Sequence, residues 1–447
     1  MKKGSHEYIA IGLLLFALFF GAGNLIFPAF LGQNAGYNTL YAVIGFVITG
    51  VGLPLASVLA VCRSGKSLMD LASRVSPLYG LLFSCALYLT IGPFFAIPRT
   101  ATTSFEIAVA PLLAEGDKDF ALYAFAAVFF LLSWWLAISP SKLVPRIGKV
   151  ITPALLLFLF ILISASVLSP MGAYTEPGAA YDTPVKAFAN ALLEGYNTMD
   201  VLAGLVFGVI VLEAIDLYGV TDPEEKVRTA LKCGLISTFF LFIIYAALVY
   251  LGATSVSVLG HVENGAPVLV GSSRFYFGAF GGSILGAIVI LACLTTSIGL
   301  IASCAAFFHQ LMPSIGHKTW STGFALLSFG IALFGLSSII KGAIPVLLFL
   351  YPLAVALIIL ALTDPVTHGS RRVYALAVGF TVLPSLYDAL KFLKIAPSAL
   401  APFMDALPLS QYSMGWISFF AAGFALGLIL EKFSPLPGNP PAEEDIP

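Results

Sequence analysis

The sequence predicts an all-α membrane protein with twelve transmembrane helices, and three observations support this prediction. Hydrophobic residues make up 59% of the 447 residues and charged residues only 10%, with a mean hydropathy of +0.98. Soluble domains carry roughly 25% charged residues. Apolar segments of membrane-spanning length recur along the chain, each ended by charge, Pro or Gly. Two of them are interrupted by Gly or polar residues at their centres, which is typical of spans that line a polar site.

Composition and charge exclude several classes of function. The net charge of −1 offers no basic surface, so we expect no nucleic-acid partner. The five cysteines are odd in number, lie in or beside apolar segments and have no metal-site spacing. We interpret them as small buried side chains. The histidines and cysteines form no nucleophile–base or metal constellation within the spans, which argues against an enzyme and against a cofactor.

Twelve apolar segments follow one another along the chain. Each is near the length of roughly 20 residues that a helix needs to cross a bilayer. The first is too long for the apolar core of a signal peptide and lacks a cleavage site, so we expect it to remain as a span. The predicted spans are 8–32, 40–61, 78–97, 120–138, 151–168, 188–217, 235–251, 284–308, 323–340, 346–362, 373–390 and 417–430.

An even number of spans places both termini on one side of the membrane. Most of the 22 basic residues lie in loops on the side of the N-terminus, and basic loops stay in the cytoplasm. We therefore expect the cell inner (plasma) membrane, with the N-terminus 1–7 and the C-terminus cytoplasmic and the loop 169–183 outside. The Pro- and acid-rich tail 435–447 is predicted to be disordered.

The first span carries Gly21-Ala22-Gly23-Asn24 at its centre, followed by Pro28. Gly is a poor helix former, by about 1 kcal/mol against Ala, and Pro28 cannot donate to the carbonyl one turn earlier. An unwound stretch at this point would offer N–H groups to a carboxylate and carbonyls to an ammonium or a cation. A close helix crossing through small residues is the structural alternative.

The sixth span is interrupted as well, by the polar stretch Glu194–Asp200. Asn197, Thr198 and Asp200 suit the cap and first turn of a new helix. Interruptions in spans one and six, five spans apart, indicate inverted repeats with a substrate site at the midplane between them. Alternatively, residues 184–200 form an outer loop that caps an ordinary helix.

The eighth span holds three consecutive hydroxyls, Thr295, Thr296 and Ser297, in an otherwise apolar stretch. Neighbouring residues of a helix point about 100° apart, so Thr295 and Thr296 cover a broad polar sector. Hydroxyl and carbonyl oxygens without a carboxylate suit a weakly bound monovalent cation better than a divalent one. In the alternative, each hydroxyl only bonds back to a carbonyl one turn earlier.

The third span contains a further break and a charge, in Gly92–Arg99. The aromatic residues of this stretch could wall a pocket. Arg99 is a functional candidate, as any intramembrane cation is. Alternatively, its side chain extends to the outer interface or pairs with Glu106.

Three stretches, Phe16–Pro28, Gly92–Ala101 and Gly195–Asp200, resemble the motifs of one known family. This is the branched-chain amino acid:cation symporter family, the BrnQ-type carriers of leucine, isoleucine and valine, and the resemblance covers essentially the whole chain. It implies the leucine-transporter fold of the amino acid–polyamine–cation superfamily. Two inverted five-helix repeats would then occupy residues 8–168 and 184–362, with two extra helices in 363–434.

The resemblance extends to sodium symporters of the same fold and implies a sodium site between spans one and eight. Its ligands would be the carbonyls of Ala17, Phe20 and Ala292 and the hydroxyls of Thr295 and Thr296. Those symporters hold a second sodium beside the residue that matches Asn24. No ligands for it are identified here in spans six and seven, so a second ion site stays open.

The resemblance also implies where an amino acid binds. The amides of Ala22 and Gly23 would hold its carboxylate, with Asn24 close by, and carbonyls of the sixth span would meet its ammonium. An aliphatic side chain would lie among aromatic and aliphatic residues of spans three and eight. The substrate-binding residues so implied are Ala22, Gly23, Asn24, Phe94, Phe95, Gly195, Tyr196, Asn197, Thr198, Thr296 and Leu300.

Together with these features, the resemblance implies secondary active import of a branched-chain amino acid with a cation. Sodium is favoured because no carboxylate lies beside Thr295 and Thr296. The alternatives are a proton route through Asp200 or Glu194, and a carrier of another small amino acid, a nucleobase or a polyamine. A channel is disfavoured because the polar residues gather at three points. We expect a monomer embedded in the lipid bilayer.

Overall fold

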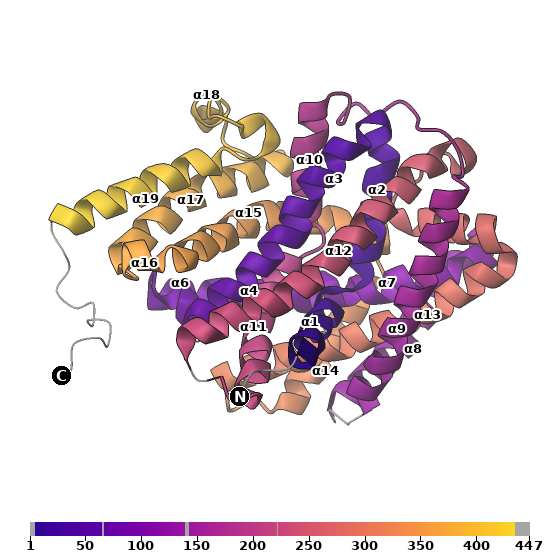
Figure 1. Cartoon of the computed structure of the whole chain (residues 1–447), viewed down its shortest axis with the longest axis horizontal. Coiled ribbons are helices and arrows are strands. Elements are labelled where there is room, and N and C mark those ends of the chain that lie inside the picture. The colour runs from indigo at the N-terminus through magenta and orange to yellow at the C-terminus, as the bar shows by residue number, and fades with distance from the viewer. Residues whose placement is uncertain (1–4, 65–66, 139–142, 221, 434–447) are drawn as a thin grey trace. The chain divides into compact units, whose positions relative to one another are not determined.

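The computed structural model describes residues 5–64, 67–138, 143–220 and 222–433. These residues form helices joined by turns and loops, with no strand among them (Figure 1). The predicted all-α class is confirmed. The tail 435–447, which the sequence predicts to be disordered and cytoplasmic, lies outside the described residues, as do residues 1–4 of the expected cytoplasmic N-terminus.

The α-helices of six or more residues are given next, and most of them are labelled in Figure 1. In chain order they are α1 (Ser5–Phe19), α2 (Ala22–Ala35), α3 (Thr39–Val47), α4 (Leu53–Ser64), α5 (Leu68–Ser73), α6 (Pro77–Leu89), α7 (Ala96–Ala108), α8 (Lys118–Ile138), α9 (Leu143–Leu168), α10 (Pro184–Tyr196), α11 (Asp200–Leu217), α12 (Pro223–Leu259), α13 (Gly265–Leu311), α14 (His317–Ala332), α15 (Leu336–Leu362), α17 (Arg371–Phe392) and α19 (Trp416–Phe433).

Within the described residues, eight helices are long and apolar enough to cross a membrane, and nine if the bent pair α10 and α11 counts as one span. Two shorter apolar helices, Tyr8–Phe19 and Pro153–Leu168, add to these. The chain is a multi-pass membrane protein. The count of twelve spans stays a prediction.

The boundary between the predicted ninth and tenth spans differs from the structure. Hydropathy predicts a span over 323–340, but α14 ends at Ala332 and α15 begins at Leu336. Gly335 between them has a φ of +78°, in the left-handed region that glycine adopts without steric cost. The flanking Leu333 and Phe334 keep this turn apolar, so hydropathy does not reveal it.

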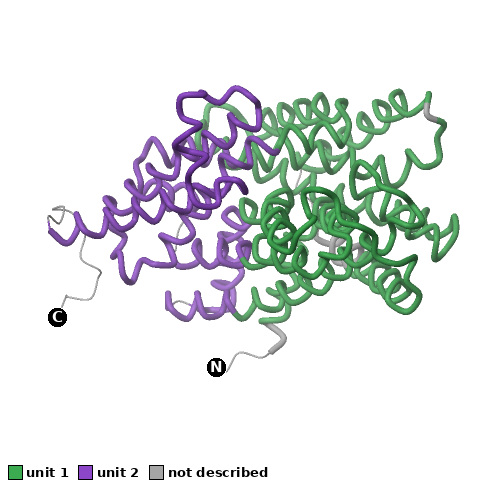
Figure 2. The backbone as a smooth tube through the Cα atoms, turned by 90° about the horizontal axis from the view of Figure 1, so that it is seen from above, with its two compact units in different colours: residues 1–52, 88–203, 232–343 green, residues 53–87, 204–231, 344–447 purple. Residues whose placement is uncertain are grey.

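The chain divides into two compact units, each built from segments that are far apart in the sequence (Figure 2). Unit 1 comprises residues 1–52, 88–203 and 232–343. Unit 2 comprises residues 53–87, 204–231 and 344–447. The interrupted stretches of spans one, three and six and the hydroxyls of span eight all belong to unit 1.

In unit 1, α2 and α12 approach each other through glycines. A Cβ added to Gly32 of α2 would lie 2.0 Å from the carbonyl oxygen of Val249 in α12. A Cβ added to Gly252 of α12 would lie 1.9 Å from the carbonyl oxygen of Ala29 in α2. Small residues allow such backbone contact between helices in lipid, where close packing contributes much of the association free energy. The contact fixes α2, whose first turn begins at the first break.

Replacing Gly32 with alanine should lower the melting temperature of the purified protein. The added methyl must displace backbone atoms of α12, and overpacking of this kind costs about 1–3 kcal/mol. The matched control is Gly330→Ala in α14, where no atom lies within 4 Å of the added Cβ. Equal melting temperatures for the two variants would contradict the packing assigned to Gly32.

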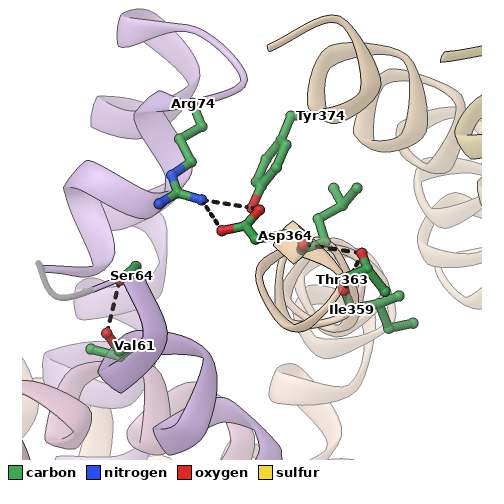
Figure 3. A network of polar contacts seen from close by, with 8 residues as sticks. Val61, Ser64, Arg74, Ile359, Thr363, Asp364 and Tyr374 are labelled. Atoms are coloured by element: carbon green, nitrogen blue, oxygen red, sulfur yellow. Dashed lines mark hydrogen bonds and ion pairs between the residues drawn. The ribbon is translucent and has the colours of Figure 1, made fainter. Parts of the chain in front are cut away.

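Unit 2 contains a polar network between segments that are distant in the sequence (Figure 3). Arg74, directly after α5, forms an ion pair with Asp364, the first residue of the short helix α16 (Asp364–Thr367). The hydroxyl of Tyr374 in α17 donates to Asp364 Oδ1 at 2.8 Å and accepts from Arg74 Nη1 at 3.0 Å. The network therefore joins the segment after α5 to α16 and α17.

Asp364→Asn should destabilise the protein by about 1.5–3 kcal/mol, the usual contribution of a hydrogen bond to a charged group. The reason is that Arg74 and Asp364 are only 30% and 18% exposed, so water replaces the lost interaction poorly. Thermal unfolding in detergent measures the effect. In the control Asp182→Asn, the ion pair with Lys186 has both side chains 45% exposed and is worth less than about 1 kcal/mol. Similar changes in the melting temperature of Asp364→Asn and Asp182→Asn would contradict the larger contribution assigned to the ion pair of Asp364.

Candidate functional site

The predicted break in the first span is present, and it is shorter than the sequence suggests. α1 ends at Phe19 and α2 begins at Ala22, with Gly21 extended at φ −125° and ψ −165°. Ala22, Gly23 and Asn24 therefore form the buried first turn of α2 and are not themselves unwound. Asn24 Oδ1 accepts a hydrogen bond from the N–H of Gly21 at 2.9 Å. The first N–H groups of a helix have no partners within that helix.

The second break separates α10 from α11, whose axes are bent by 46°. Met199 has a φ of +65°, an uncommon conformation for a residue other than glycine. The N–H of Met199 donates to the carbonyl of Tyr196 at 3.0 Å, and the hydroxyl of Thr198 donates to the carbonyl of Gly195 at 2.9 Å. The interruption predicted in the sixth span is thus present as well.

Asn24, Asp200 and Tyr245 form a buried cluster that joins the two breaks. Asn24 Nδ2 donates to Asp200 Oδ2 at 2.6 Å and also to the hydroxyl of Tyr245. The Tyr245 hydroxyl donates to the same oxygen of Asp200 at 3.0 Å. The three residues are 2%, 3% and 0% exposed, respectively. Because buried polar groups need partners, this cluster fixes the start of α2 against the start of α11.

Tyr245 is the member of the cluster that the sequence analysis missed. It lies in α12, within the predicted span 235–251. Its ring packs edge-on against Phe46 of α3, with the ring centroids 5.3 Å apart. A tyrosine hydroxyl in the middle of an apolar helix requires a hydrogen-bond partner when buried. This requirement is the feature of the sequence that could have identified Tyr245 as part of a polar cluster. Asp200 and Tyr245 are the residues of spans six and seven that lie beside Asn24.

Arg99 of α7 is buried, with 5% of its surface exposed, so it does not extend to the membrane interface. Its Nη1 donates to the carbonyl of Asn197 at 2.6 Å, and its Nη2 to the carbonyl of Thr198 at 3.4 Å. The guanidinium carbon lies 5.1 Å from the centroid of the Phe27 ring in α2. Arg99 therefore contacts both broken spans.

The two threonine hydroxyls of the eighth span turn back onto one carbonyl. Thr295 Oγ1 and Thr296 Oγ1 donate to the carbonyl of Ala292 at 2.8 and 3.1 Å. These are the bonds to a carbonyl one turn earlier that the structural alternative to an ion site predicts. Thr296 nevertheless lies beside the first break, since its Oγ1 is 3.9 Å from the position of a Cβ added to Gly21. Thr296 of α13 therefore lies close to the break that follows α1.

Ala17 and Phe20, the remaining residues predicted to bind sodium, lie at the end of α1. Ala17 is exposed and Phe20 is 6% exposed. The N–H of Gly21 turns to the side chain of Asn24, so it does not donate to the carbonyl of Ala17 as it would in a continuous helix. The break thus removes the helical donor from one carbonyl that the sequence assigns to the ion.

Phe94 and Phe95 lie at the break in the third span. Gly92 departs from helical geometry there, with φ −92° and ψ −123°. The two aromatic rings follow with centroids 6.4 Å apart, and Phe94 is 38% exposed. Leu300 of α13 is 7% exposed. A shared pocket for an aliphatic side chain stays a prediction.

Two cavities are described, and residues of the breaks line neither of them. One, of about 470 Å³, lies at the end of α7 and is lined in part by Glu106, Lys118 and Arg274. Glu106 accepts a hydrogen bond there from Asn264 Nδ2 at 3.0 Å. The other, of about 370 Å³, is an apolar cavity lined by residues of α8 and α14. The candidate site is therefore defined by its polar contacts.

Two broken spans that meet at their breaks are typical of one fold of membrane transporters, and solved structures show that the chain has a similar fold. The chain is similar to Mhp1, a nucleobase-cation-symport-1 family transporter in a closed conformation with bromovinylhydantoin bound. The TM-score is 0.62 at 13% identity, covering 95% of this chain and 92% of that one. It is also similar to MhsT in complex with L-phenylalanine, with a TM-score of 0.57 at 16% identity, covering 97% and 99% of the two chains. The predicted leucine-transporter fold is confirmed.

The chain belongs to the family described as branched-chain amino acid transport protein, whose model matches residues 4–434. It is 42% identical to the branched-chain amino acid permease BrnQ of Bacillus subtilis, over 97% of this chain and 98% of the relative. It is 38% identical to the branched-chain amino acid transport system 2 carrier protein of Pseudomonas aeruginosa, over 95% and 96%. The predicted family is confirmed, and the protein is a transporter and not an enzyme.

Proposed function

We propose that the protein imports leucine, isoleucine and valine across the plasma membrane in symport with sodium. Membership of the branched-chain amino acid transport family supports the substrate class. The observation that carries the proposal is the hydrogen bond of 2.6 Å between Asn24 and Asp200, which brings two broken spans together. Breaks of this kind are where secondary transporters bind substrates and coupling ions.

At one end of the proposed substrate site, the amides of Ala22 and Gly23 hold the carboxylate, with the Asn24 side chain close by. Two properties of the first turn of α2 support this: its N–H groups lack helical partners, and the positive end of the helix dipole favours an anion. The aliphatic side chain lies among residues of the third and eighth spans. Those residues are Phe94, Phe95, Thr296 and Leu300.

At the other end, the substrate ammonium binds carbonyls of the stretch Gly195–Thr198, with Tyr196 and Asn197 between them. These carbonyls already accept bonds within the protein, from Thr198 Oγ1 at Gly195 and from Arg99 at Asn197 and Thr198. The carbonyl of Gly195 also accepts from the N–H of Thr198 at 3.3 Å, so both of its lone pairs are engaged. A carbonyl oxygen has two lone pairs, so the carbonyls of Asn197 and Thr198 can each accept a further hydrogen bond from the ammonium.

The proposed sodium site lies between α1 and α13. Its ligands are the carbonyls of Ala17, Phe20 and Ala292 and the hydroxyls of Thr295 and Thr296. The position of Thr296 beside Gly21 supports this site. A hydroxyl that donates to the carbonyl of Ala292 keeps its own lone pairs for a cation, so the bonds seen here are compatible with bound sodium.

In the proposed cycle, sodium ties the first and eighth spans together and favours an outward-open state, to which the amino acid binds. Spans one, two, six and seven then rock against spans three, four, eight and nine within the repeats 8–168 and 184–362, and both ligands leave into the cytoplasm. Coupling requires that each ligand binds one state better than another. The N- and C-termini are cytoplasmic and the transporter is a monomer in this scheme.

Asp200 supports a second candidate, in which a proton is the coupling ion. Its carboxylate is buried and accepts hydrogen bonds from both Asn24 and Tyr245. A carboxylate that gains and loses a proton at the junction of the breaks would change the contacts of both spans. Another small amino acid, a nucleobase or a polyamine would then be the alternative substrate.

Uptake of labelled leucine into proteoliposomes tests the proposal, with inward sodium and inward proton gradients imposed separately. We expect uptake under the sodium gradient, with isoleucine and valine competing within roughly 10–200-fold, because one methylene changes binding by only about 1–3 kcal/mol. Uptake under the proton gradient alone would favour the Asp200 route. No leucine uptake or binding under either gradient would contradict the proposed substrate class.

A further inference from the structure

The cavity of about 470 Å³ at the end of α7 has no role in the proposed function, and we call it the outer cavity. Its volume lies in the range of roughly 300–1,000 Å³ that is usual for small-molecule sites. It is lined by one carboxylate, Glu106, and by two cations, Lys118 and Arg274. Apolar side chains such as Phe105 and Leu122 line much of the remainder, and all of these residues belong to unit 1. The outer cavity therefore offers charges of both signs beside apolar surface.

The outer cavity lies where the chain passes from water into the membrane. Its lining residue Lys118 belongs to the polar stretch 115–119, and the apolar part of α8 starts directly afterwards with Phe120. Phe120 is 79% exposed, and Leu112 and Phe275, each next to a lining residue, are 73% and 50% exposed. Exposed apolar residues of a transmembrane protein face lipid, and aromatic residues gather at the depth of the headgroups. Lipid headgroups therefore lie within reach of the outer cavity.

We propose that the outer cavity binds a zwitterionic ligand through its primary ammonium and its anionic group, and that this ligand is the headgroup of an aminophospholipid. The ammonium binds Glu106, and the phosphate binds Arg274, with Lys118 close by. The proposed topology places the loop after α7 outside, so the lipid belongs to the outer leaflet. No residue assigned to the amino acid or to sodium lines this cavity.

The surroundings of Glu106 favour an ammonium. Its Oε2 accepts a hydrogen bond from Asn264 Nδ2 at 3.0 Å, whereas Oε1 accepts none from the part of the chain that the structure describes. Glu263 and Lys118 both lie close enough to interact electrostatically with Glu106. Two carboxylates and one lysine leave a net negative charge here. Hydrogen bonds from an ammonium to a carboxylate are charge-assisted and stronger than bonds between neutral groups.

Arg274 supplies the charge for the anionic group of the ligand. It is exposed, and its Nη2 donates to the carbonyl of Pro111 at 3.1 Å. Among the described residues it forms no ion pair with a carboxylate. A guanidinium carries several N–H donors in a planar fork, so the bond to Pro111 positions the group and leaves donors for a phosphate. Arginine binds phosphate oxygens in this bidentate way.

A free amino acid has the same chemistry, since its carboxylate can take the place of the phosphate. The exposed side chains of Leu112, Phe120 and Phe275 favour the lipid. Acyl chains attached to the headgroup would pack along these residues, whereas a free amino acid would leave them uncovered. Pockets with basic residues between transmembrane helices are known sites for phospholipid headgroups.

The test measures the melting temperature of the purified full-length protein in detergent with increasing dihexanoyl phosphatidylethanolamine or dihexanoyl phosphatidylcholine. The two lipids share the phosphate and differ at the headgroup nitrogen, which donates hydrogen bonds only in phosphatidylethanolamine. We expect phosphatidylethanolamine to raise the melting temperature of the wild type at a concentration at least about tenfold lower. A hydrogen bond to a charged group changes affinity by this factor or more.

Two variants assign this preference to the outer cavity. Glu106→Gln should abolish it, because the amide keeps an oxygen for the bond from Asn264 but loses the negative charge. Arg274→Gln should weaken the response to both lipids alike, because both carry the phosphate. The matched controls are Glu213→Gln and Arg228→Gln, which change exposed residues outside the cavity lining. They should keep the wild-type response to both lipids.

Equal responses of the wild type to the two lipids, or an unchanged preference in Glu106→Gln, would overturn the inference. Should Glu106→Gln not fold, an unchanged response of Arg274→Gln to both lipids would overturn it as well. Stabilisation by leucine that Glu106→Gln removes would assign the cavity to a free amino acid and overturn the lipid assignment. The lipid titrations involve no transport, so a failure of leucine import and a failure of lipid binding are distinguishable.

Discussion

Replacing Asp200 with alanine should reduce leucine uptake at least about a hundredfold. The variant leaves two buried donors, Asn24 Nδ2 and the Tyr245 hydroxyl, without the oxygen that both now contact. Each buried donor that loses its acceptor costs about 1–3 kcal/mol. The hydrogen bonds lost are those that hold the first break against the second, so the geometry of both breaks should change. Initial rates of leucine uptake in proteoliposomes measure the effect.

Two further variants make this result specific. Asp200→Asn keeps an oxygen that can accept from Asn24 or Tyr245, so under sodium coupling it should retain more uptake than Asp200→Ala. Under proton coupling both variants should lose proton-driven uptake alike. Asp216→Asn is the matched control, because this carboxylate lies on the same helix, is 50% exposed and pairs with Lys226 at 2.7 Å. Uptake by Asp200→Ala within a few-fold of the wild type would contradict the role of the cluster.

Thr296→Ala should raise the sodium concentration for half-maximal leucine uptake about tenfold, the effect of losing one ligand interaction of roughly 1.4 kcal/mol. The hydroxyl lies between the carbonyl of Ala292, at 3.1 Å, and the first break at Gly21. Its removal should change the sodium dependence more than the maximal rate at saturating sodium. Titration of uptake against external sodium at fixed leucine measures the shift.

Thr296→Ser restores the hydroxyl and should return the sodium dependence towards that of the wild type. The control Ser283→Ala removes a hydroxyl from the same helix, α13, that also donates to a backbone carbonyl one turn earlier, at 3.2 Å. It should leave the sodium dependence unchanged. A Thr296→Ala variant with the wild-type titration curve would rule out the proposed sodium site.

The breaks in spans one and six were predictable because their causes are local. Gly21 and Gly23 weaken a helix wherever they stand, and the polar stretch before Asp200 carries residues that favour a new helix start. The exact geometry was not predictable. Asn24 turns its side chain back to the N–H of Gly21. The first turn of α2 begins at Ala22, so only Phe20 and Gly21 are unwound.

The partners of Arg99 and Asp200 could not be predicted, because they depend on how distant segments pack. Arg99 bonds to a carbonyl 98 residues away along the chain, and Asn24 and Asp200 are 176 residues apart. Glycines such as Gly32 and Gly252 permit the close packing of α2 and α12. Their presence in the sequence does not say which helix they face. The role of Tyr245 could not be predicted for the same reason. Its hydroxyl indicates that a hydrogen-bond partner is needed, but the sequence does not show which residue supplies it.

The most direct test of the central claim is leucine-driven entry of radiolabelled sodium into proteoliposomes with equal sodium inside and outside. Coupling between two ligands is reciprocal. An inward leucine gradient should therefore accumulate sodium when no sodium gradient is present, and Thr296→Ala should reduce this accumulation at low sodium. Leucine entry that moves no sodium, or that acidifies the vesicle interior instead, would contradict sodium symport and favour the route through Asp200.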